Sequence, residues 1–280
     1  MLLNFLHHFP APAPSLLGVP NSAYLRETRE LRHAMNAGSQ AQYRDEGYLL
    51  EPGLIPNDLI EACRQRVLEV IEERPGWDPR RFQDLDPAVF RSSAGHPVPV
   101  GIQRPASEEE VFSHVAHHPG LVEAMRNLLE GNVQLSTDQI GVKHGWLDVE
   151  QGGRSYFHQD SWYWKIEPEM GCNCWIPLQD VGQNDIALAV MPGSHSDWQL
   201  TEHESYFDDP SMGHVKDGVF APFKRHRIPH SDIDSERERL IPTEPGDGLF
   251  FTNYTWHRSE PNRSGETKAF YAIAYQRTDI

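Results

Sequence analysis

Residues 156–164, with the sequence YFHQDSWYW, contain the pattern on which the interpretation of the whole chain depends. His158 and Asp160 are separated by one residue, and alternate residues of a β-strand share a face, so both side chains can reach one metal ion. Five aromatic residues in this stretch indicate an interior position rather than a solvated loop. Two histidines and one carboxylate on one side of an ion leave three adjacent positions open, an arrangement typical of non-haem iron. The stretch therefore predicts part of a metal site at a strand end.

The same His-x-Asp spacing occurs at two other places, so it is weak by itself. His195 and Asp197 follow the turn MPGS at 191–194, where an exposed histidine is expected. His230 and Asp232 lie in a polar segment, where solvated side chains are expected. Context therefore favours His158 and Asp160 as the ligands.

A third ligand is expected on another strand further along the chain. The turn PGDG at 245–248 precedes an apolar strand, and that strand leads to His257, which lies 257 − 158 = 99 residues after His158. Taken alone, His257 is equally well interpreted as a core histidine bonded to the backbone. The upstream motif makes it the favoured third ligand.

A keto acid bound to such an iron needs a cation for its far carboxylate, and two basic residues after His257 qualify. Arginine grips a carboxylate with two parallel hydrogen bonds, whereas lysine is a point charge. Arg263 lies in a turn between Pro261 and Gly265, where exposure is expected. Lys268 stands at the start of a strand and can point inward, so it is favoured.

The composition is that of one globular domain over residues 1–280. The net charge of −16 argues against nucleic-acid and anionic-membrane partners, which attract basic surfaces. No apolar stretch approaches the roughly 20 residues that span a bilayer. Three cysteines without a framework spacing favour a reducing, cytoplasmic location. Cys172 and Cys174 are better interpreted as buried small side chains than as a metal site.

Patterning divides the chain into a helical part followed by a β-rich part. Residues 1–21 are expected to form an irregular arm, 22–131 mainly helical support, and 132–276 a jelly-roll core with a lid or insertion at 195–245. Predicted helices span 57–73, capped by Asn57 or Asp58, 107–117, with Ser107 and Glu110 as a capping box, and 119–130, ending at a left-handed Gly131. Predicted strands span 133–142, 171–178, 186–191, 248–254 and 268–276. The fold class is thus mainly β with a helical buttress.

Four motifs in order resemble the phytanoyl-CoA dioxygenase family of iron(II)- and 2-oxoglutarate-dependent oxygenases. They are FHQD at 157–160, WIPLQDV at 175–181, MPGSH at 191–195, and His257 followed by PNRS at 261–264. The resemblance implies a double-stranded β-helix, one Fe²⁺, and decarboxylation of 2-oxoglutarate with O₂ to give succinate, CO₂ and a hydroxylated small molecule. It also implies that Ser259 and Trp175 help to hold the keto acid and that Lys143 lies near the pocket.

One departure from the family concerns the chemistry, and one agreement with it does too. Family members usually have arginine where Lys268 stands, so Arg263 is a second candidate for the carboxylate. Halogenating relatives lack the carboxylate ligand, and the presence of Asp160 therefore argues against halogenation. Candidates to line the substrate pocket are Trp146, Arg154, Trp162 and Trp164, although packing roles are at least as good an interpretation of each tryptophan.

Two other functions remain open from the sequence. One is a jelly-roll metalloenzyme, an isomerase or hydrolase, that uses no keto acid and needs no cation after the distal histidine. The other is a non-catalytic binding module on the same barrel.

Overall fold

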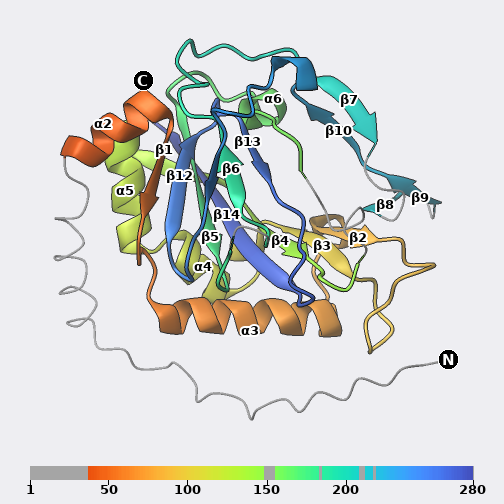
Figure 1. Cartoon of the computed structure of the whole chain (residues 1–280). Coiled ribbons are helices and arrows are strands. Elements are labelled where there is room, and N and C mark those ends of the chain that lie inside the picture. The colour runs from red at the N-terminus through yellow and green to blue at the C-terminus, as the bar shows by residue number, and fades with distance from the viewer. Residues whose placement is uncertain (1–36, 148–154, 183–184, 208–211, 217–218, 280) are drawn as a thin grey trace, which may run out of the picture.

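The computed structural model describes residues 37–147, 155–182, 185–207, 212–216 and 219–279. The expected arm at 1–21 and the candidate Arg154 lie outside these ranges. More described residues belong to strands than to α-helices, and most of the helices lie along the left and lower edges of the view (Figure 1). The mainly β class with a helical buttress is confirmed.

A nine-stranded antiparallel sheet forms the body of the molecule. Its central strands are joined in the order β12-β5-β14-β4, and β14 pairs along its whole length with β4. Each of the four matches a strand expected from the sequence. In spatial order the strands are β1 (Tyr48–Glu51), β12 (Gly248–Thr252), β5 (Gly171–Pro177), β14 (Lys268–Arg277), β4 (Val133–Lys143), β3 (Pro99–Gln103), β2 (Phe82–Leu85), β8 (Met212–Lys216) and β9 (Val219–Pro222).

A three-stranded sheet covers the inner face of the large sheet. It contains β11 (Arg239–Ile241), β6 (Leu188–Val190) and β13 (His257–Ser259), with β6 in the middle. Trp175, Phe251 and Leu188 from the two sheets pack together between them. Two sheets that enclose one core, with strands alternating between them along the chain, form the expected jelly roll or double-stranded β-helix.

Helices cover the outer face of the large sheet. They are α2 (Ala37–Glu46), α3 (Asn57–Glu73), α4 (Glu110–Ala116) and α5 (Pro119–Leu129). Residues of α3 at helical spacing, such as Ile60, Cys63 and Val67, pack with Phe112 of α4 and with Tyr271 of β14. The apolar stripe read from the sequence is thus the face that α3 turns toward the sheet. Cys172 and Cys174 lie in the same core, where burial raises the pKa of the Cys172 thiol to about 12. Their interpretation as buried small side chains is confirmed.

The helix ends differ from the sequence-based expectations. The prediction of a capping box is wrong. Ser107 belongs to the 3-10 helix η2 (Pro105–Ser107), and its hydroxyl donates to the carbonyl of Arg104 at 2.9 Å. The residue before α4 is Glu109, and its side chain makes no capping bond. Neither Asn57 nor Asp58 caps α3, which follows Pro56. The left-handed residue after α5 is Glu130 (φ 53°) rather than Gly131.

Segments expected to be helical or irregular also contribute strands. Residues 22–131 supply β1, β2 and β3 of the large sheet, with the 3-10 helix η1 (Pro79–Arg81) before β2. Residues 195–245 contain β8, which extends the large sheet through β2, and β11, which joins the small sheet. They also form a separate hairpin of β7 (Glu204–Phe207) and β10 (Lys224–Arg227), followed by the 3-10 helix η3 (His230–Asp232).

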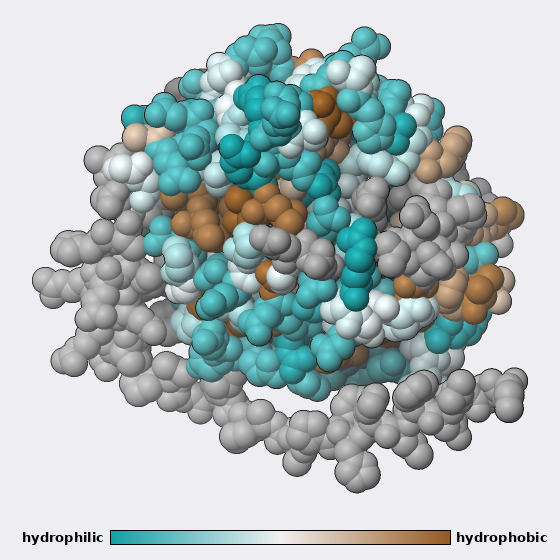
Figure 2. Space-filling view, viewed as in Figure 1, coloured by the Kyte–Doolittle hydropathy of each residue, from teal (hydrophilic) through white to brown (hydrophobic). Residues whose placement is uncertain are grey.

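The surface agrees with the low mean hydropathy of the chain, −0.59. The face seen in Figure 2 is mostly hydrophilic, with small apolar areas between the polar ones. Among the described residues, no helix combines the length and the apolar character needed to cross a bilayer.

Candidate metal centre

The backbone brings the first and last predicted ligands together. His158 and His257 form an isolated antiparallel β-bridge. The amide of His158 donates to the carbonyl of His257 at 3.1 Å, and the reverse bond is 3.2 Å. Paired residues of an antiparallel ladder project to the same side, so the imidazoles meet with ring centroids 4.3 Å apart.

Asp160 completes a cluster with these two histidines. It is the first residue of the short helix α6 (Asp160–Trp164), so the chain turns into a helix directly after the His158 strand. One carboxylate oxygen lies 3.6 Å from Nε2 of His158, and the other lies 3.6 Å from Nε2 of His257. One ligand atom from each residue lies within 4.8 Å of the other two. Among the described residues this is the one group of histidine, cysteine and acidic side chains close enough to share a metal ion.

Hydrogen bonds fix the orientation of both imidazoles. Nδ1 of His158 lies 2.8 Å from the carbonyl oxygen of Tyr156, and Nδ1 of His257 lies 3.0 Å from that of Thr255. A carbonyl only accepts, so Nδ1 carries the proton and Nε2 keeps its lone pair for a metal. Burial lowers the pKa of His257 to about 4, and its ring is therefore neutral at pH 7. The donor set fits a divalent transition metal such as iron.

The carboxylate of Asp160 has a further partner that the sequence did not reveal. Nδ2 of Asn173, on β5, donates to Oδ2 of Asp160. Burial alone would raise the pKa of Asp160, but His257, His158 and the bond from Asn173 outweigh it, so the pKa is lowered. The aspartate is ionised and ready to bind a cation. Asn173 lies two residues before Trp175 on a predicted strand, and this alternation could have placed it on the inner face.

Basic side chains lie beside the small sheet. Nζ of Lys143, at the end of β4, donates to Oγ of Ser259 at 2.6 Å and to the carbonyl of Glu260 at 2.7 Å. Lys268 is buried, and its Nζ lies 2.7 Å from the carbonyl of Asp180 and 3.1 Å from a carboxylate oxygen of Asp185. Arg263 is exposed and lies 3.4 Å from Glu260. Ser155, which sequence reasoning missed, accepts a bond from the amide of Ser259 at 2.7 Å.

The tryptophans expected near the site differ in their surroundings. Trp175 is buried, its ring packs against Phe270, and among the described residues nothing accepts a bond from its Nε1. Trp162 stacks on His203 at 4.5 Å. Trp146 and Trp164 are exposed, and Trp146 packs against His144 and Phe90.

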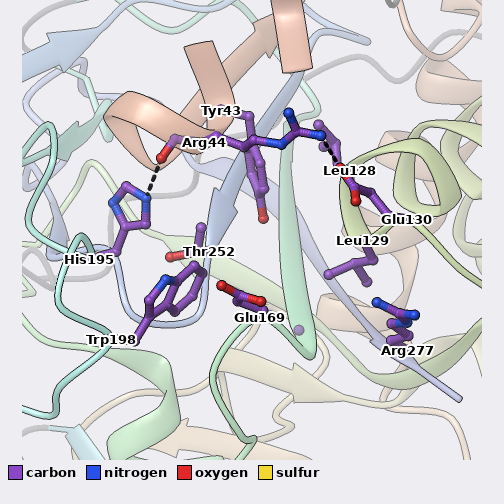
Figure 3. Close-up of a pocket in the computed structure, with 11 residues that line it drawn as sticks. Tyr43, Arg44, Leu128, Leu129, Glu130, Glu169, His195, Trp198, Thr252 and Arg277 are labelled. Carbon is purple, nitrogen blue, oxygen red and sulfur yellow. Dashed lines mark hydrogen bonds and ion pairs between the residues drawn. The ribbon is translucent and has the colours of Figure 1, made fainter. Parts of the chain in front are cut away.

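The other two His-x-Asp pairs lie outside the cluster. His195 is only 1% exposed, so the expectation of an exposed turn residue was wrong. Its Nε2 lies 2.9 Å from the carbonyl of Arg44, which fastens the turn at 193–196 to α2 (Figure 3). It lines a cavity of about 260 Å³ together with Tyr43, Trp198 and others, but none of the three clustered residues does. His230 is exposed, as expected.

The family model described as phytanoyl-CoA dioxygenase (PhyH) matches residues 43–270, more than half of the chain. The chain belongs to the phytanoyl-CoA dioxygenase family. A probable phytanoyl-CoA dioxygenase from Caenorhabditis elegans is 23% identical over 88% of this chain and 77% of its own length. A 1-deoxypentalenic acid 11-beta-hydroxylase from Streptomyces exfoliatus is 25% identical over 79% of this chain and 73% of its own.

Solved structures agree with the fold. Crystal structures of EctD from S. alaskensis, 16% identical over 87% of this chain and 77% of their own, superpose with TM-scores of 0.66 and 0.63. The first contains bound Fe, and the second contains 2-oxoglutarate and 5-hydroxyectoine. Membership of the phytanoyl-CoA dioxygenase family confirms the expected enzyme class, a non-haem iron and 2-oxoglutarate-dependent dioxygenase.

Proposed function

We propose that this phytanoyl-CoA dioxygenase family member hydroxylates a small molecule, with His158, Asp160 and His257 as the ligands of Fe²⁺. The observation that carries the proposal is the β-bridge between His158 and His257, which brings two imidazoles together beside the ionised carboxylate of Asp160. The hydroxylase from Streptomyces exfoliatus, which is similar over most of the chain, supports hydroxylation among the possible outcomes.

The metal, when bound with 2-oxoglutarate, supplies oxidative decarboxylation of the keto acid by O₂ and oxidation of the substrate. The protein's part is to position the reactants. Each imidazole presents Nε2 because its Nδ1 is bonded to a carbonyl. If both histidines and one oxygen of Asp160 bind the ion, three adjacent coordination positions would remain for a bidentate keto acid and O₂.

The far carboxylate of 2-oxoglutarate is proposed to bind at Lys268, with Lys143 and Ser259 beside it. Both lysines are buried, and Lys143 is already bonded to Ser259. Nζ of Lys268 lies 3.1 Å from a carboxylate oxygen of Asp185, and the carboxylate of a dicarboxylic acid would compete with this partner for the ammonium group. Arg263 is the weaker candidate because its side chain is exposed and lies near Glu260. Among the described residues, the buried Nε1 of Trp175 has no acceptor, which supports a place for it beside the keto acid.

Two measurements test the proposal, one without oxygen and one under air. Addition of 2-oxoglutarate to the Fe²⁺-loaded protein without oxygen is expected to produce a weak visible absorption band. A panel of candidate substrates under air, scored by succinate release, is expected to show one class that stimulates turnover. A metalloenzyme that needs no keto acid would show neither signal. A binding module with a vestigial site could show the band but no succinate, and either outcome would overturn the proposal.

A further inference from the structure

We propose that Asn173 is a positioning residue that forces Asp160 to bind the metal through one oxygen only. The inference rests on the metal centre of the proposed function but concerns its coordination rather than its reaction. Asn173 itself contacts the carboxylate of Asp160 and would not touch the metal.

The two oxygens of Asp160 are otherwise equivalent toward the histidines. Oδ1 lies 3.6 Å from Nε2 of His158, and Oδ2 lies 3.6 Å from Nε2 of His257. A carboxylate placed in this way can bind an ion through either oxygen or through both. The hydrogen bond from Nδ2 of Asn173 goes to Oδ2 alone. It engages a lone pair of that oxygen and leaves Oδ1 as the better metal donor.

The number of oxygens matters for the reaction of this class. A six-coordinate ion that is bound by two imidazoles and both oxygens of Asp160 would have only two open coordination positions. A keto acid that binds through two atoms would fill both, and O₂ would have none. With one oxygen of Asp160 bound, three positions remain. Asn173 thus keeps the position that O₂ requires.

The surroundings of Asn173 hold its amide in place. The residue is 3% exposed and lies on β5, with Phe251 of β12 and Ala274 of β14 as its cross-strand neighbours. A buried amide that donates to an ionised carboxylate makes a charge-assisted bond, which is stronger than a neutral one. Its Oδ1 has no hydrogen-bond donor within reach among the described residues.

The test compares Asn173→Leu and Asn173→Ala with the wild-type protein, using Co²⁺ as the probe metal. Leucine has a similar branched shape without a donor, whereas alanine leaves a space, so a shared effect reports the lost hydrogen bond. Asn253 is also a buried asparagine, and its side chain makes no hydrogen bond to any described residue, the three ligands included. Asn253→Leu is therefore the matched control for replacing a buried amide. Thermal unfolding of the metal-free variants identifies any that fail to fold.

We expect both Asn173 variants to bind Co²⁺ about 10–100-fold more weakly, the range found for residues that orient metal ligands. Their cobalt absorption spectrum should change in shape because the coordination changes, and Asn253→Leu should keep the wild-type spectrum. Wild-type affinity and an unchanged spectrum in both Asn173 variants would overturn the inference and leave the proposed function intact. If the wild-type protein binds no Co²⁺ and no Fe²⁺, the metal centre fails, and the proposed function fails with it.

Discussion

Lys143 and Lys268 are direct cross-strand partners in the antiparallel pairing of β4 and β14, and both are buried. Like charges directly opposite each other in a sheet are destabilising. The structure offsets this cost with neighbouring acceptors, namely the hydroxyl of Ser259 for Lys143 and the carboxylate of Asp185 for Lys268. A site that places two cations side by side is suited to a ligand with a carboxylate.

Replacement of Lys268 by alanine is expected to raise the KM for 2-oxoglutarate by about 10–100-fold, because a hydrogen bond to a charged group contributes roughly 1.5–3 kcal/mol. Lys143→Ala should have a similar effect. Arg263→Ala is the control, and its KM should stay close to that of the wild type. Steady-state succinate formation at varied 2-oxoglutarate provides the measurement. A large rise in the KM for 2-oxoglutarate in Arg263→Ala alone would show that Arg263, and not Lys268, binds the far carboxylate.

His158→Ala is expected to abolish Fe²⁺ binding, since two ligands alone do not close a facial site. The matched control is His230→Ala, which removes a histidine from the same His-x-Asp pattern at an exposed position. Equilibrium dialysis with metal analysis measures the bound iron per chain. Equal iron in both variants would contradict the assignment of His158.

Gly47→Ala is expected to destabilise the protein strongly. Gly47 has φ +81°, and a Cβ there would lie 2.4 Å from Nδ1 of His195 and 2.5 Å from Oγ1 of Thr255. The left-handed conformation costs a non-glycine residue about 1–2 kcal/mol, and the overpacking adds about 1–3 kcal/mol. Gly53→Ala isolates the first effect, because Gly53 has φ +62° and no atom near the added Cβ. Urea unfolding should therefore show a larger loss of unfolding free energy for Gly47→Ala than for Gly53→Ala. Equal losses in the two variants would contradict the close contact with His195.

The stability of the protein should fall on acidification between about pH 6.5 and pH 4. Burial lowers the pKa of His118 from 6.5 to about 4 in the folded state. Within this window the unfolded chain holds the proton and the folded chain does not, so the free energy of unfolding rises with pH. Across the whole window, one such histidine changes the free energy of unfolding by on the order of 3 kcal/mol.

His118→Asn tests this dependence without removing the helix cap. The Nδ1 of His118 accepts a bond from the amide of Gly120 at the start of α5, and asparagine is a good residue for that role. Urea unfolding at pH 7.5 and at pH 4.5 measures how much the free energy of unfolding falls on acidification. This fall should be smaller in the variant than in the wild type. An unchanged loss would show that other buried groups account for the acid sensitivity.

The sequence predicted the metal cluster because its signals are local. His158 and Asp160 share one short stretch, and the strand before His257 is apolar enough to recognise by itself. It also predicted the four central strands of the large sheet. Two of these strands, β5 and β12, are buried along their whole length, so their apolar composition alone marks them.

Features that depend on distant partners were not predicted. His195 is buried because α2, about 150 residues earlier, supplies the carbonyl of Arg44. Strands β2 and β3 are short and polar in part, and they are ordered by pairing with β8 and β4 rather than by their own pattern. The capping residues depended on side-chain geometry that the sequence does not contain. The contact of Asn173 with Asp160 was missed for the same reason.

The bridge between His158 and His257 is made of main-chain atoms, so a substitution of either residue other than by proline leaves its donors and acceptors in place. A variant in which all three ligands are replaced is thus expected to retain its architecture, and chelators should strip the ion without melting the barrel. Shape and reactivity are therefore expected to be separable in this molecule, because the main-chain bonds that bring the two histidines together need no ion.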